Sequence, residues 1–215
     1  MESVFADFCG PDDVITPLGH KDEMRRNNGK PLCRNFESSK ELEDKWIASL
    51  IEGNRLYRRE GARESMKFYS HMGAGEIKSK LDATFWANAF KFTIERHPYE
   101  KVVSAAFYKL GLKRPTEEFP KMLKKILRKQ SYATFRYYSI DNQVIVDDIV
   151  KLENLRPDLE RVAKKIGVTL PDELPRMKSH VRQDERPARE ILTQSQKDEV
   201  YHVCKQEFDL LGYER

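Results

Sequence analysis

The chain has 215 residues, of which 39% are hydrophobic, 10% aromatic and 34% charged, with a formal net charge of +4. Eleven Phe, nine Tyr and two Trp supply the apolar surface of a folded core, which excludes wholesale disorder, and the small net charge does not by itself indicate a nucleic-acid-binding protein. No apolar run approaches the roughly 20 residues that a membrane span needs, and no signal peptide is visible. The three cysteines are too scattered for a disulfide framework. We therefore expect a cytoplasmic protein without a membrane span.

The first 37 residues predict little regular structure beyond one helix. Apolar spacing favours an apolar-faced helix in residues 1–9, followed by turn chemistry at 10–13. Residues 14–17 are expected to be extended, and residues 19–37 are polar enough to predict a surface loop.

Two helices are expected next. Ser38 or Ser39 can cap the first, which continues to Ile51. The second is expected to begin after Gly73 and to run through Leu81, with Trp86 following on the same approximate period.

The second half of the sequence alternates strand and helix patterns. Strands are predicted at 90–95 and 144–152, and helices at 99–110, 116–129, 157–166 and 193–212. With both strands buried on their two faces, this order predicts one helix-rich α/β domain over residues 1–215, with three layers and a parallel central sheet.

One segment combines the features of an anion site. A buried strand delivers Arg96 to the carboxyl edge of the sheet, where ligands gather, and a helix with unpaired N–H groups begins immediately afterwards. Lys101 adds positive charge and Ser104 a hydroxyl. Two simpler interpretations remain: Arg96 pairs with Glu95 or Glu100, and Ser104 is only a small residue at a helix–sheet contact.

The run from Arg96 to Ser104, R-H-P-Y-E-K-V-V-S, resembles the 3′-phosphate-binding motif of the family 2 sulfotransferases, which use 3′-phosphoadenosine 5′-phosphosulfate (PAPS). Further blocks that resemble this family occur at residues 10–25, 71–86, 146–155 and 207–213. The resemblance therefore covers nearly the whole chain and implies a fold similar to the P-loop sulfotransferases.

The resemblance also implies roles for five residues. Arg96 and Ser104 would bind the cofactor's 3′-phosphate, and Arg182 and Arg186 would lie in a loop that passes near the cofactor. His71 would be the catalytic base that takes the proton of the acceptor hydroxyl, although a lone histidine can also simply cap a helix.

The family's P-K-T-x-x-T/S loop, which cradles the 5′-phosphosulfate, has no counterpart in the sequence, so we expect the first strand and this loop to be missing. The expected activity is transfer of a sulfuryl group from PAPS to a hydroxyl of a carbohydrate or another small acceptor. The alternative is an inactive module that binds a nucleotide or a protein partner. No cluster of Cys, His and carboxylates has the spacing of a metal site.

Two other patterns have competing interpretations. The basic run 121–129 could contact a membrane surface or nucleic acid, but a docked amphipathic helix with a solvated basic face is favoured, and no nucleic-acid partner is expected. The aromatic residues between Tyr132 and Tyr138 could stack on an adenine, but core packing is favoured for at least half of them.

Overall fold

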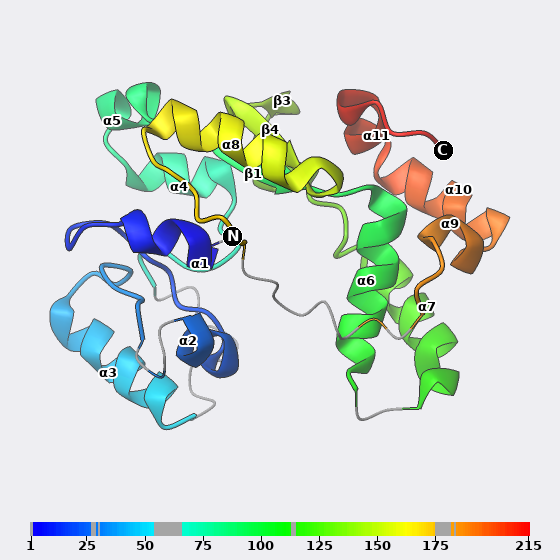
Figure 1. Ribbon diagram of the computed structural model, residues 1–215, viewed down its shortest axis with the longest axis horizontal. Helices are drawn as coiled ribbons and strands as arrows, with labels where there is room; N and C mark the ends of the chain where they lie inside the picture. The colour runs from blue at the N-terminus through cyan, green and yellow to red at the C-terminus, as the bar shows by residue number, and fades with distance from the viewer. Residues whose placement is uncertain are drawn as a thin grey trace. The chain divides into compact units, whose positions relative to one another are not determined.

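The computed structural model describes residues 2–26, 29, 31–53, 66–112, 115–174, 182 and 184–215 (Figure 1). The chain divides into two compact units. The first comprises Met1–Ala89 and Leu170–Pro175, and the second comprises Phe90–Thr169 and Arg176–Arg215. Each unit contains its own cluster of buried apolar side chains.

The first unit is helical in its described part. Its helices are α1 (Glu2–Phe5), η1 (Ala6–Phe8), α2 (His20–Arg26), α3 (Lys40–Ile51), α4 (Ala74–Lys80) and α5 (Ala83–Asn88). Ser39 caps α3 as predicted, because its hydroxyl accepts a hydrogen bond from the Leu42 N–H at 3.3 Å. The helices expected at 1–9 and after Gly73 are also confirmed.

The prediction of a surface loop over residues 19–37 is wrong in part, because α2 lies within this segment. The cause is a buried carboxylate that composition does not reveal. Glu23 has no exposed surface and accepts N–H hydrogen bonds from Leu18, Leu32 and Cys33 at 2.8–3.0 Å. It thereby satisfies backbone donors in the segments on both sides of α2, and Phe36 follows as a fully buried core residue.

The second unit combines a small parallel sheet with helices. Its elements are β1 (Phe92–Glu95), α6 (Pro98–Leu110), η3 (Thr116–Glu118), α7 (Phe119–Lys129), η4 (Phe135–Tyr137), β2 (Ser139–Ile140), β3 (Gln143–Val144), β4 (Asp148–Lys151), η5 (Leu152–Asn154), α8 (Leu155–Ile166), α9 (Ala188–Ile191), α10 (Gln194–Val203) and α11 (Lys205–Leu211). The protein is therefore mixed α/β and rich in helix, as expected.

In the described residues the parallel sheet has two strands. β1 pairs with β4 in a register that runs from Phe92 opposite Asp148 to Glu95 opposite Lys151. Most positions of both strands are only half-buried, so the expectation of strands buried on both faces is wrong for this pair.

The strand predicted over 144–152 is divided in two. Its first residue belongs to β3, which pairs antiparallel with β2, and only β4 joins the parallel sheet. Asp141 and Asn142 have φ angles of 51° and 62°, so they form a tight turn that folds β3 back on β2.

The core of the second unit is built around α6. The buried face of this helix packs against α7, α9 and the C-terminal helices. The helix expected over 193–212 is broken at Cys204, a fully buried residue at the junction of α10 and α11. In α11, Phe208 packs with ring-centroid distances of 5.4 Å to Tyr99 and 5.2 Å to Tyr201.

We predict that Phe208→Ala lowers the free energy of unfolding by about 3–5 kcal/mol, because it leaves a cavity among these rings. Leu210→Ala on the same helix is the matched control, since Leu210 is 43% exposed and its loss should cost about 0.5 kcal/mol or less. Urea denaturation measures both variants. Equal losses in the two variants would contradict this account of the core.

Candidate functional site

The site is set by the junction of β1 and α6. β1 ends at Glu95, Arg96 follows, and His97 is the N-cap residue of α6. Pro98 occupies the first turn of the helix, where the N–H that it lacks would have no helical partner. This arrangement of strand, short turn and helix agrees with the prediction, and it places Arg96 beside the N-terminus of a 13-residue helix.

A single carboxylate organises the arginines near this junction. Glu100 Oε2 accepts from Arg96 Nη2 at 3.1 Å and from Arg182 Nη1 at 2.5 Å. Glu100 Oε1 accepts from the Ala188 N–H at 2.7 Å. Partial burial raises the pKa of Glu100, but the hydrogen bonds from Ala188 and Arg182 outweigh it, so the pKa lies below its ordinary value.

Arg182 and Arg186 are both engaged by protein groups. Arg182 also donates to the carbonyl oxygens of Asp184, at 2.7 Å, and Arg186, so all three of its nitrogens have partners. The guanidinium of Arg186 pairs with the Asp184 carboxylate at 2.6 Å and lowers the pKa of that carboxyl to about 2. These contacts fix the shape of the loop before α9.

Arg96 and Ser104 retain donors that a ligand could use. Apart from the contact with Glu100, the Arg96 guanidinium has no hydrogen bond to any residue that the structure describes, and its side chain is 31% exposed. Ser104 lies one turn beyond Glu100 on α6 and is half-buried. Within the described parts of the chain, its hydroxyl likewise makes no hydrogen bond.

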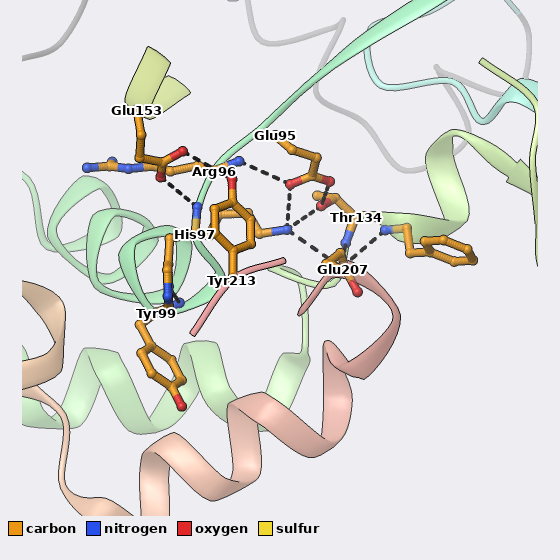
Figure 2. A network of polar contacts seen from close by, with 10 residues as sticks. Glu95, Arg96, His97, Tyr99, Thr134, Glu153, Glu207 and Tyr213 are labelled. Carbon is orange, nitrogen blue, oxygen red and sulfur yellow. Dashed lines mark hydrogen bonds and ion pairs between the residues drawn. The ribbon is translucent and has the colours of Figure 1, made fainter. Parts of the chain in front are cut away.

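Lys101 does not belong to this group, so its expected contribution to the anion site is wrong. Its ammonium points into a buried polar cluster, where it lies 2.8 Å from Glu95 Oε2, 2.5 Å from Thr134 Oγ1 and 3.6 Å from Glu207 Oε1 (Figure 2). Glu95 and Glu207 are 2% and 1% exposed. A buried carboxylate requires a cationic partner, so these two carboxylates hold the ammonium of Lys101 in the interior, away from the proposed anion site.

Groups that border the buried polar cluster are correspondingly hard to ionise. Burial raises the pKa of the Cys204 thiol to about 12, with a further contribution from Glu207. Burial also raises the pKa of Tyr138, again assisted by a neighbouring carboxylate, that of Glu95. These groups therefore serve packing rather than proton transfer near neutral pH.

His97 connects the start of α6 to the C-terminal segment. Its Nδ1 accepts from the Tyr99 N–H at 3.2 Å, and its Nε2 lies 3.0 Å from the Glu214 carbonyl oxygen. Since that carbonyl can only accept, the hydrogen-bond network assigns the proton to Nε2. Glu153 completes the connection by accepting from the His97 N–H at 2.7 Å and from the Tyr213 hydroxyl at 3.1 Å (Figure 2).

His71, the residue to which the resemblance gives the role of base, belongs to the first unit. It is exposed and lies in a turn with a φ of 64°, a conformation that few non-glycine residues adopt. The four predicted cofactor-binding residues belong to the second unit.

In both of these patterns, apolar side chains pack in the core. Tyr132, Phe135 and Tyr138 are buried, so most of the aromatic run contributes to the core. The apolar face of α7 is also buried, whereas its lysines are exposed, which confirms the docked helix with a basic outer face.

The described residues contain no group of three or more His, Cys, Asp or Glu side chains that could hold a metal ion. Across the same residues, every helix is too short or too polar to cross a membrane.

Sequence reasoning missed the central role of Glu100. Its pairing with Arg96 carries a local signal, because the two residues are four positions apart, and this pairing was one of the simpler interpretations of Arg96. Its contacts with Arg182 and Ala188 span 82 and 88 positions and have no local signal.

Comparisons with family models, with curated proteins and with solved structures find no match to this chain.

We predict that Glu100→Gln lowers the free energy of unfolding by about 1–3 kcal/mol and speeds hydrogen exchange at the Ala188 N–H, because charge-assisted bonds to two guanidiniums are lost. Glu160→Gln on α8 is the control, since the carboxylate of Glu160 is 55% exposed and pairs only with Arg156 among the described residues. Denaturation and hydrogen-exchange mass spectrometry measure both effects. Unchanged exchange at Ala188 would contradict the role given to Glu100.

His97 should make stability depend on pH. Burial lowers its pKa below the ordinary value of 6.5, so the folded chain binds this proton more weakly than the unfolded chain. The contribution of neutral His97 is therefore complete above pH 6.5 and is lost as the pH falls through the lower pKa of the folded state.

We predict that His97→Asn, which keeps an N-cap acceptor but cannot titrate, reduces the loss of unfolding free energy between pH 6.5 and pH 5. One proton accounts for a slope of at most about 1.4 kcal/mol per pH unit. The control is His202→Asn, which removes an exposed imidazole on α10. If His97→Asn keeps the full slope of the parent chain, His97 is not the group responsible.

Proposed function

We propose that the second unit binds the 3′-phosphate of PAPS through Arg96 and Ser104, and that the protein is a sulfotransferase that uses a hydroxylated acceptor such as a carbohydrate. The observation that carries the proposal is a pair of available donors: the partly exposed guanidinium of Arg96, just before α6, and the hydroxyl of Ser104, eight positions later on that helix. Their spacing is the one in the motif that the sequence resembles.

The chemistry of the donor set fits a phosphate monoester. Arg96 keeps N–H groups without partners among the described residues, and a planar guanidinium binds two phosphate oxygens at once. The N-terminus of α6 adds a partial positive charge, and Ser104 adds a neutral donor. Glu100 is a positioning residue in this proposal, because it holds the guanidinium of Arg96 beside the helix.

The three-layer architecture similar to that of the P-loop sulfotransferases belongs to the same proposal. It is supported by the parallel pairing of β1 with β4 and by the position of Arg96 at the carboxyl end of β1. When bound, PAPS supplies the sulfuryl group. The role of base for the acceptor hydroxyl is assigned to His71 by the resemblance alone. Arg182 and Arg186 support the cofactor loop through their contacts with Glu100 and Asp184.

We predict that adenosine 3′,5′-bisphosphate binds the full chain and that Arg96→Ala weakens binding by about 10-fold to 150-fold, the equivalent of one charged hydrogen-bonding group. Ser104→Ala should weaken it by about 2-fold to 10-fold, and Arg96→Lys should recover only part of the affinity. Isothermal titration calorimetry measures each value.

Two substitutions serve as matched controls for this titration. Arg136→Ala removes an exposed arginine of the same unit, and Ser195→Ala removes an exposed serine on another helix. Both should leave the affinity unchanged. An absence of binding, or equal losses in Arg96→Ala and Arg136→Ala, would overturn the phosphate site.

The catalytic part of the proposal requires a separate measurement. Transfer of labelled sulfate from PAPS to a panel of hydroxylated carbohydrates should occur with the full chain and should fall with His71→Asn. Binding of the bisphosphate without transfer to any acceptor would instead support the alternative, an inactive module that binds a nucleotide.

A further inference from the structure

Helix α7 presents one continuous row of cations. Its 11 residues include no Asp or Glu, and its cations are all exposed. These cations are Lys121, Lys124, Lys125, Arg128 and Lys129. At about 100° per residue they occupy an arc of about 140°, and the buried Leu123, Ile126 and Leu127 belong to the face that packs in the core.

The five cations of this row have no ion partner among the described residues, whereas several cations on other helices do. On α3, Lys45 pairs with Glu41 at 2.7 Å, and on α8, Arg156 pairs with Glu160 at 2.5 Å. No cation of the α7 row makes an ion pair or hydrogen bond to any residue in the described part of the chain, and this includes Glu117 and Glu118 just before the helix. Like charges three and four positions apart repel one another, and no acidic side chain on α7 offsets this repulsion.

The side chains of α7 restrict the kind of anionic partner. Its apolar residues are used in the core, so the helix cannot insert an apolar face into a bilayer. Its one aromatic residue, Phe119, stacks on Phe107 at 4.3 Å and offers no free platform for a nucleobase. Four of the five cations are lysines, which act as point charges and lack the fork with which arginine recognises fixed phosphate geometry.

We infer that the α7 row docks the protein on an anionic lipid bilayer, through the phosphate groups of the lipids. A bilayer offers dense, laterally mobile negative charge, which suits a row of hydrated ammonium groups without fixed geometry. The inference concerns a surface of α7 alone and does not depend on the phosphate site at Arg96. Docking through charge without insertion is reversible and weakens as salt shortens the Debye length from about 10 Å at 0.1 M to about 3 Å at 1 M.

The test is co-sedimentation of the full chain with vesicles of phosphatidylcholine alone or of phosphatidylcholine with 30 mol% phosphatidylglycerol. We expect binding only to the second composition, at low salt. Each lysine near the membrane surface is expected to contribute about 5-fold to the affinity, so the double variant Lys124→Gln/Lys125→Gln should weaken binding by about 25-fold. The matched control is Lys164→Gln with Lys165→Gln, which neutralises an adjacent exposed pair on α8 and should leave binding unchanged.

Circular dichroism establishes that both double variants are folded, and the single variant Lys125→Gln, with an expected loss of about 5-fold, replaces the α7 pair if that pair unfolds. Three results would overturn the inference. They are absence of binding to the anionic vesicles, equal losses in the α7 and α8 variants, and tighter binding to heparin or duplex DNA than to the vesicles at the same ionic strength.

Discussion

The ammonium of Lys101, held between two buried carboxylates, is the constraint on which the second unit depends. Glu95 ends β1 and Glu207 lies in α11, so one side chain of α6 joins the sheet to the C-terminal helices. Thr134 adds its hydroxyl and its N–H to the same cluster. Each carboxylate would be costly to bury alone, and their shared cation makes the arrangement of these elements specific.

The buried polar cluster also determines what faces outward. Successive residues of an extended strand point to opposite sides, so burial of Glu95 directs Arg96 away from the cluster. The guanidinium of Arg96 therefore meets Glu100, while only its backbone N–H donates to Glu95, and Lys101 is unavailable to any ligand at the surface. The positive charge that remains near the start of α6 therefore comes from Arg96 and Arg182, which share one carboxylate oxygen.

The proposed phosphate site and the proposed lipid-binding row use positive charge in two different ways. At Arg96 the charge is a single planar group, fixed by Glu100 and supported by a helix N-terminus, which suits one small ligand with a defined geometry. On α7 the charge is a row of exposed lysines without ion partners among the described residues, which suits an extended surface of diffuse charge. The two proposals can therefore fail independently.

The sequence by itself determined most of the local elements and the spacing within them, but not α2, the division of the strand predicted over 144–152 or the break at Cys204. Pro98 and Gly111 mark the ends of α6, and the distance from Arg96 to Ser104 along the chain needs no tertiary information. Only the tertiary structure decided which charges meet. Two of the three partners of Glu100 lie 82 and 88 positions away, the carboxylate of Glu23 is buried inside a polar segment, and Lys101 turns inward. The physical reason is that a buried charge takes whatever partner the fold brings within reach, and local periodicity does not record that partner.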